Sequence, residues 1–109
     1  MSYKSFSERC YQVLRTVPSG KVTTYKDIAQ ALGSKSYRAV GNAMHKNPYA
    51  PQVPCHRVVA SDGSIGGFAF GLARKKQLLR REGITICAEK IRDFETVRMK
   101  LRRLASRHA

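Results

Sequence analysis

The residues TYKDIAQALGSKSYRAVGNAMHKNP, numbered 24–48, predict two short helices joined by a tight turn. Thr24 is a good cap for a first helix over 25–32, and Gly33 opens the turn before a second helix over 36–46. The apolar residues recur at three- and four-residue steps: Ile28, Ala29, Leu32, Ala39, Val40, Ala43 and Met44. Helix, glycine turn and helix form the helix-turn-helix pattern of DNA-binding proteins, although an ordinary αα-hairpin fits this stretch equally well.

Further elements are predicted on both sides of this pair. Apolar periodicity predicts three more helices and two short β-prone pieces: helices over 5–16, 72–82 and 88–107, and β-prone residues 21–25 and 84–86. The expected fold is therefore mainly α, winged helix-turn-helix-like, with short β segments. We expect residues 1–87 to form the main domain. Residues 88–109 are expected to form a basic amphipathic helix, packed on that domain or joining it to another one.

The charge points to a polyanionic partner. The chain has 109 residues and a net charge of +14, from 21 Lys and Arg against 7 Asp and Glu. Nucleic acid is the first choice of partner and a membrane surface the second. The second helix of the pair presents Arg38, Asn42, His45 and Lys46 outward, and its small residues allow close approach to a nucleic-acid backbone. These small residues are Ala39, Gly41 and Ala43.

Several protein classes are excluded by what the sequence contains. No apolar run approaches the roughly 18 residues of a membrane span, and the N-terminus has no apolar signal region. Three widely spaced cysteines argue against a disulfide framework and against a cysteine zinc site. We interpret Cys10 and Cys87 as buried residues that only fill space in the core. We expect a cytoplasmic protein associated with the nucleoid, or a nuclear one in a eukaryote, that needs no metal or cofactor.

A second motif, Pro54-Cys55-His56-Arg57-Val58, carries candidate chemistry. A cysteine attacks as its thiolate, and a neighbouring base makes thiolate available near neutral pH. His56 cannot easily turn back onto the adjacent thiol, so a proton relay would run through a water and need an acid to hold the imidazole. Glu82 ends a predicted helix, where the dipole disfavours an anion, which suggests a specific partner. The plainer alternative is that Cys55 is a small buried residue and His56 a loop histidine.

A glycine-rich loop follows this motif. Asp62-Gly63 predicts a tight turn, and Gly66-Gly67 and Gly71 make a loop whose backbone suits a flat ligand. Phe68 and Phe70, flanked by glycines, are either core residues or the wall of a base pocket.

Six segments together resemble the DNA-binding, catalytic C-terminal domain of the O6-alkylguanine-DNA alkyltransferases, the methylated-DNA–protein-cysteine methyltransferases. They occur in the family's order and near its spacing, across residues 6 to about 86: 20–25, 38–44, 47–48, 54–59, 63–68 and 79–83. The resemblance implies DNA repair by irreversible transfer of an alkyl group from O6-alkylguanine to Cys55. It also implies minor-groove binding by the helix-turn-helix and flipping of the damaged base.

The resemblance assigns roles residue by residue. The catalytic residues it implies are the nucleophile Cys55, the water-mediated base His56, its holder Glu82 and the hinge residue Asn47. The substrate-binding residues are Tyr25, Val58, Phe68, Ala69 and Lys75. The DNA-binding residues are Arg38 (which would fill the vacated space in the stack), Ala39, Gly41, Asn42, Lys46 and Arg57. Phe68 and Ala69 depart from the tyrosine and serine that are common in the family.

Several alternatives stay open. The family usually has an additional N-terminal domain, so we expect either a minimal member or one domain of a longer fusion with a second repair domain. Alkyltransferase-like proteins share the fold and bind alkylated DNA without transfer because they lack the cysteine. A winged-helix regulator explains the charge but not residues 54–58, and a cysteine hydrolase would need an acyl-group cleft. The expected partner is double-stranded DNA containing O6-alkylguanine, bound by a monomer.

Overall fold

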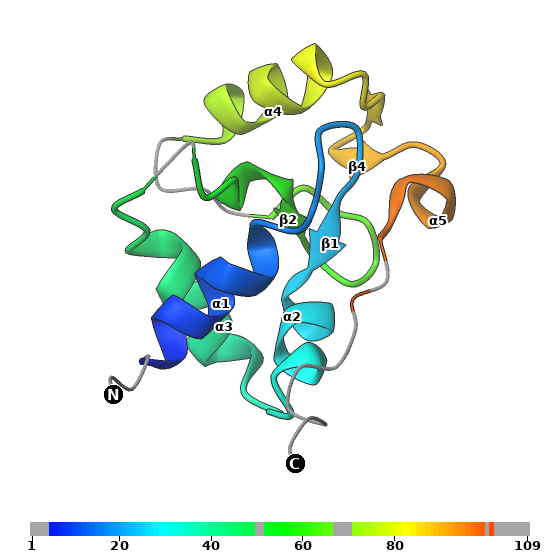
Figure 1. Ribbon diagram of the computed structural model, residues 1–109. Coiled ribbons are helices and arrows are strands. Elements are labelled where there is room, and N and C mark those ends of the chain that lie inside the picture. The colour runs from blue at the N-terminus through cyan, green and yellow to red at the C-terminus, as the bar shows by residue number, and fades with distance from the viewer. Residues whose placement is uncertain (1–4, 50–51, 67–70, 100, 102–109) are drawn as a thin grey trace.

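The computed structural model describes residues 5–49, 52–66, 71–99 and 101 (Figure 1). The described chain is mainly helical, and none of its helices is long and apolar enough to cross a membrane. In chain order the elements are α1 (Phe6–Leu14), β1 (Thr23–Thr24), α2 (Tyr25–Ala31), α3 (Tyr37–His45), the 3-10 turn η1 (Cys55–Arg57), β2 (Val58–Val59), α4 (Leu72–Arg81), β3 (Ile86–Cys87), β4 (Lys90–Ile91) and α5 (Phe94–Val97).

The helices α1, α2 and α3 pack around one apolar core. Each begins at a polar residue whose side chain accepts a hydrogen bond from the backbone N–H three residues on. The caps are Ser5 (3.1 Å), Thr24 (2.9 Å) and Ser36 (3.2 Å). The core between the helices includes Cys10, Leu14, Ile28, Val40 and Met44. The predicted helix pair of residues 24–46 is therefore confirmed, with α2 and α3 each one or two residues shorter than expected.

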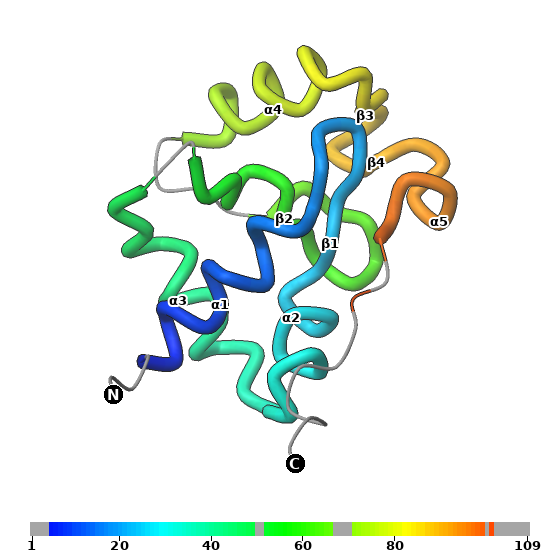
Figure 2. The backbone as a smooth tube through the Cα atoms, in the orientation of Figure 1, coloured from blue at the N-terminus to red at the C-terminus, as the bar shows by residue number. Residues whose placement is uncertain are grey.

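A short parallel strand pair joins this helical unit to the Cys55 motif. Thr23 pairs with Val58 and Thr24 with Val59, so the strand leading into α2 lies beside the strand that leaves η1. Figure 2 shows β1 and β2 between the three N-terminal helices and α4. The pairing fixes the Cys55 motif against the start of α2, although the two segments are far apart in sequence.

A second apolar core lies under α4. It contains Val22 and Val59 from the central strands, Ile65, Leu79 of α4, Ile84 and Ile91. In Figure 1, α4 lies along the end of the molecule opposite to α2 and α3. The Cys55 motif is thus held between two cores, one on the helix-turn-helix side and one on the α4 side.

The predicted helix over 88–107 is wrong for residues 88–99. Ala88 (φ 50°) and Glu89 (φ 65°) have left-handed backbone, which an α-helix cannot contain, and they form the turn of a hairpin that pairs β3 with β4. Asp93 (φ 56°) is also left-handed and precedes the four-residue α5. The predicted apolar stripe does reach the second core, through Ile91 and then Phe94 and Val97. Residues 102–107 lie outside the described residues.

Candidate active site

The Cys55 motif forms a tight 3-10 turn inside the protein. The N–H of Arg57 donates to the carbonyl of Pro54 (2.9 Å), and the N–H of Val58 donates to the carbonyl of Cys55. Cys55 and His56 are each only 4% exposed. Both residues belong to the turn, and β2 begins after it, at Val58. The turn therefore holds two consecutive residues, a thiol and an imidazole, in the protein interior.

Glu82 contacts His56, as expected from its position at the end of α4. His56 Nε2 lies 3.0 Å from Glu82 Oε2. Gly83 (φ 87°) ends α4, with its N–H donating to Arg80 and that of Ile84 donating to Leu79. This cap fixes the direction in which Glu82 leaves the helix. When the imidazole is neutral, the carboxylate holds the proton on Nε2 and leaves Nδ1 as the acceptor.

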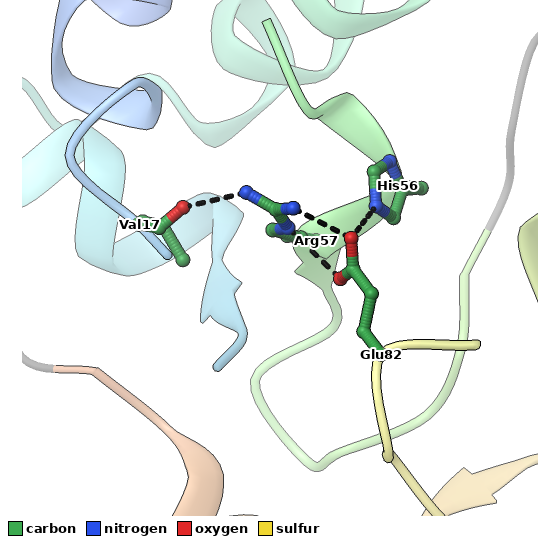
Figure 3. Close-up of polar contacts among 4 residues, drawn as sticks. All are labelled: Val17, His56, Arg57 and Glu82. Atoms are coloured by element: carbon green, nitrogen blue, oxygen red, sulfur yellow. Dashed lines mark hydrogen bonds and ion pairs between the residues drawn. The ribbon is translucent and has the colours of Figure 1, made fainter. Parts of the chain in front are cut away.

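Arg57 lies in the same network, where it contacts Glu82 and Val17 (Figure 3). Its Nε donates to Glu82 Oε1 (2.9 Å) and its Nη2 to Glu82 Oε2 (2.5 Å). Its Nη1 donates to the carbonyl of Val17 (2.8 Å), and the side chain is 16% exposed. The side chain thus makes three hydrogen bonds inside the fold, and its predicted DNA contact stays a prediction. No local sequence pattern predicts the contact with Val17, which lies 40 residues away along the chain.

Burial and charge set the protonation of this network. Burial lowers the pKa of His56, and the positive charges of Arg57 and Lys75 add to this, while Glu82 opposes it. Burial alone would raise the pKa of Glu82, but hydrogen bonds from Arg57 and His56 outweigh it and hold that pKa below its ordinary value. The arrangement therefore favours a neutral imidazole beside an ionised carboxylate. Such an imidazole can accept a proton near neutral pH.

Lys75 is a buried amine of α4 that contacts β2. The residue is 0% exposed, its Nζ donates to the carbonyl of Val58 (2.7 Å), and burial lowers its pKa to about 8. A Cβ added at Gly66 would lie 3.7 Å from Lys75 Nζ and 3.6 Å from the Tyr25 hydroxyl. Three of the predicted substrate-binding residues, Tyr25, Val58 and Lys75, are thus close together. A lysine on an amphipathic helix is ordinarily expected on the outer face because of its charge, whereas α4 packs Lys75 inward against β2.

Asn47 connects α3 to the chain that enters the Cys55 turn. Its Nδ2 donates to the carbonyl of Val53 (2.8 Å), and its Oδ1 accepts from the N–H of Tyr49 (2.9 Å). The residue is 8% exposed. A side-chain bridge of this kind fixes the end of α3 relative to the segment two residues before Cys55, which is the geometry expected of the hinge residue.

The outer face of α3 carries the remaining predicted DNA-binding residues. Arg38, Asn42 and Lys46 are exposed, and Ala39 and Gly41 are partly exposed. A Cβ at Gly41 would meet no described atom within 4 Å, so internal packing does not require this glycine. The exposed part of this face is polar and cationic. Phe68 and Ala69 lie outside the described residues.

Of the two cysteines predicted to be buried, Cys10 and Cys87, only Cys10 is buried. Cys10 is buried in the first core, and burial raises the pKa of its thiol to about 11, which keeps it unreactive. Cys87 is exposed in the hairpin, contrary to the prediction that it is buried.

Comparisons with known proteins agree with this architecture. The sequence family described as "6-O-methylguanine DNA methyltransferase, DNA binding domain" matches residues 5–84. A Metallosphaera sedula protein named methylated-DNA–protein-cysteine methyltransferase is 49% identical over 86 residues, which cover 79% of this chain and 54% of that protein. The chain thus spans about half the length of this relative.

Two solved structures are similar in fold. The structure of Mycobacterium tuberculosis OGT in complex with DNA has a TM-score of 0.70 and 39% identity, over 74% of this chain and 51% of that chain. The structure of S. pombe Atl1 in complex with damaged DNA containing O6-carboxymethylguanine has a TM-score of 0.77 and 31% identity. That match covers 92% of this chain and 99% of Atl1. With most of its length matched by the family and its helices arranged as in these structures, the chain belongs to the family of the 6-O-methylguanine DNA methyltransferase DNA-binding domain.

Proposed function

We propose that this protein repairs DNA by transferring the alkyl group of O6-alkylguanine to Sγ of Cys55, once per molecule. The observation that carries the proposal is the buried His56, adjacent in sequence to Cys55 and hydrogen-bonded at Nε2 to Glu82. A nucleophile, a base and a group that orients the base are the parts that cysteine catalysis requires.

The transfer balances without a cofactor. His56 takes the thiol proton through a water at Nδ1, and the thiolate attacks the alkyl carbon. The new S–C bond forms as the C–O6 bond breaks, and the electron pair of that bond goes to guanine. The leaving guanine takes up one proton, which restores the proton count. Lys75 and the Tyr25 hydroxyl lie beside β2, where they would stabilise charge on the leaving base. The thioether on Cys55 has no leaving group, so the molecule acts once.

The target guanine would reach Cys55 by leaving the duplex. The exposed face of α3 supports contact with the DNA backbone, and the resemblance places Arg38 in the space that the flipped base vacates. Val58 offers a backbone carbonyl to the exocyclic amine of guanine, and this oxygen has a lone pair besides the one used by Lys75. Phe68 and Ala69 would complete the pocket, the first by stacking and the second through its backbone N–H.

A second candidate is binding of alkylated DNA without transfer. The match to almost the whole of Atl1, a chain solved with damaged DNA, favours it, because a fold of this size then suffices for such binding. The presence of Cys55 favours transfer instead.

Intact-mass measurement separates the two candidates. After mixing with duplex DNA containing O6-methylguanine, the protein should gain the mass of one CH₂. Cys55→Ala should gain none and should still bind the duplex, because its affinity comes from α3 and the basic charge. Cys87→Ala is the matched control, since Cys87 is the exposed thiol, and it should gain the same mass as the unaltered protein. Binding of the duplex without any mass gain in the unaltered protein would favour the second candidate.

A further inference from the structure

Arg57 makes three hydrogen bonds that tie the candidate active site to the connection between α1 and β1. Two of them reach the two oxygens of Glu82, and the third reaches the backbone carbonyl of Val17 (Figure 3). A guanidinium that binds both oxygens of a carboxylate fixes its plane as well as its position. Because Val17 is fully buried in the first core, the guanidinium itself has a rigid anchor.

The carboxylate of Glu82 has two cationic or potentially cationic partners. Its Oε2 lies 3.0 Å from His56 Nε2 and also accepts from Arg57 Nη2. The shared oxygen means that any rotation of the carboxylate changes the contact with His56. It also means that the positive charge of Arg57 compensates part of the negative charge that faces the imidazole.

We propose that Arg57 is a positioning residue for alkyl transfer: by binding both oxygens, it fixes Glu82 against Nε2 of His56 and offsets the charge of the carboxylate. The inference rests on the proposed function, in which His56 must accept a proton. Without Arg57, Glu82 would attract a proton onto the imidazole more strongly, and His56 would be a cation over a wider range of pH.

The sign of this effect follows from all the charged groups that act on His56. Glu82 favours the imidazolium form, whereas Arg57 and Lys75 disfavour it, and burial acts in the same direction as the two cations. Removing Arg57 takes away one cation and leaves the carboxylate uncompensated. The pKa of His56 should therefore rise.

The test is an NMR titration of His56 in Arg57→Gln, with the His56 signal identified by its loss in His56→Gln. The midpoint of the His56 titration should move upward by about one pH unit. Arg57→Lys keeps the charge but cannot form the three-bond arrangement, so its midpoint should move less. The matched control is Arg98→Gln, which breaks a similar guanidinium–carboxylate pair, with Asp27, at 2.9 and 2.8 Å. This control should lower stability without moving the His56 midpoint.

Single-turnover transfer on duplex DNA gives the second readout. Arg57→Gln should lose more of its rate at pH 6.5 than at pH 8.5, because a protonated His56 cannot act as a base. An unchanged His56 midpoint in folded Arg57→Gln would overturn the inference and leave Arg57 as a structural residue. If Arg57→Gln does not fold, Arg57→Lys must transfer more slowly than Arg98→Lys at saturating DNA, and equal rates would overturn the inference. A protein that never transfers refutes the proposed function, while the titration still tests Arg57.

Discussion

Two sets of cationic residues in this protein differ in what they contact. Arg57 and Lys75 lie inside the fold and donate to acceptors that the structure identifies, the carboxylate of Glu82 and the carbonyls of Val17 and Val58. Arg38 and Lys46 lie on the outer face of α3 and are exposed. The buried set is organised around groups of this chain, whereas the exposed set is predicted to contact DNA. Substitutions in the buried set should therefore alter the transfer rate and the stability of the protein. Substitutions in the exposed set should alter DNA binding and the reaction with duplex DNA.

The largest effect is expected for Glu82→Gln, which changes the acceptor that Arg57 of the buried set contacts. The neutral amide cannot stabilise positive charge on His56 during proton transfer, and single-turnover transfer should slow by about 10²–10⁴-fold. Quenched-flow measurement at saturating DNA tests this. Glu95→Gln is the matched control, because the Glu95 side chain is 76% exposed and pairs only loosely with Arg98, at 3.5 Å. An unchanged rate in Glu82→Gln would remove Glu82 from the relay.

The next effect concerns the contribution of the buried amine of Lys75 to the free energy of unfolding. Its pKa in the folded protein is about 8, against an ordinary value of 10.5. Below pH 8 both the folded and unfolded chains carry the charge, and its burial lowers stability in full. As the pH rises from 8 to 10.5, the folded protein loses the proton first, so the unaltered protein should gain stability relative to Lys75→Met.

The size of that gain follows from the shift in the pKa of Lys75. It should be on the order of 3 kcal/mol, since one pKa unit corresponds to about 1.4 kcal/mol. Urea unfolding of both proteins at several pH values measures it, and the difference between the two proteins cancels the titration of other groups. A difference that stays constant between pH 8 and 10.5 would show that the ammonium is as stable inside the protein as in water.

In the exposed set, Arg38→Ala should slow transfer from duplex DNA but not transfer from the free base. A side chain that fills the vacated space in the stack is needed only when the base leaves a duplex, where unstacking requires a few kcal/mol. Transfer from duplex DNA should slow by about 10- to 100-fold at saturating DNA. Transfer from O6-benzylguanine should hardly change. Equal losses on both substrates would mean that Arg38 supports the fold instead.

The smallest effect is expected for Lys46→Ala. A lysine that contacts a phosphate releases about one counterion on binding, so the slope of log affinity against log salt should decrease by about one. The transfer rate at saturating DNA should stay the same. Fluorescence-anisotropy titrations across a range of salt concentrations measure the slope. The same slope as in the unaltered protein would place Lys46 outside the DNA interface.

The helix-turn-helix part of the fold could be predicted because its signals are local. Ser5, Thr24 and Ser36 cap their helices through bonds to residues three positions on, and the apolar spacing of α1, α2 and α3 follows directly from burial on one face. The hairpin at 86–91 could not be predicted in this way. Ile91, Phe94 and Val97 have helical spacing, and only packing against the second core selects the left-handed turn at Ala88 and Glu89.

The candidate site was predictable only in part. The motif Pro54–Val58 indicates Cys55 and His56 by its chemistry, the resemblance pairs Glu82 with His56, and that contact is present. Lys75 shares a helix face with Leu79, so its spacing indicated burial, but its charge argued for the surface. The interior placement of Arg57 depends on the carbonyl of Val17 and on the end of α4, which no local pattern of residues 54–58 contains.

The two groups that Arg57 contacts also bear on how the protein folds. Glu82 is 25 residues away along the chain and Val17 is 40 residues away, on the other side. Closing loops of this length loses chain entropy before the contacts form, which slows folding steps that depend on them. Helices α2 and α3 are joined by a short turn and have no such requirement, whereas the contact of α1 with α3 spans 32 residues, from Tyr11 to Ala43. The helix-turn-helix should therefore form early, and His56 acquires its carboxylate partner only in the last stages of folding.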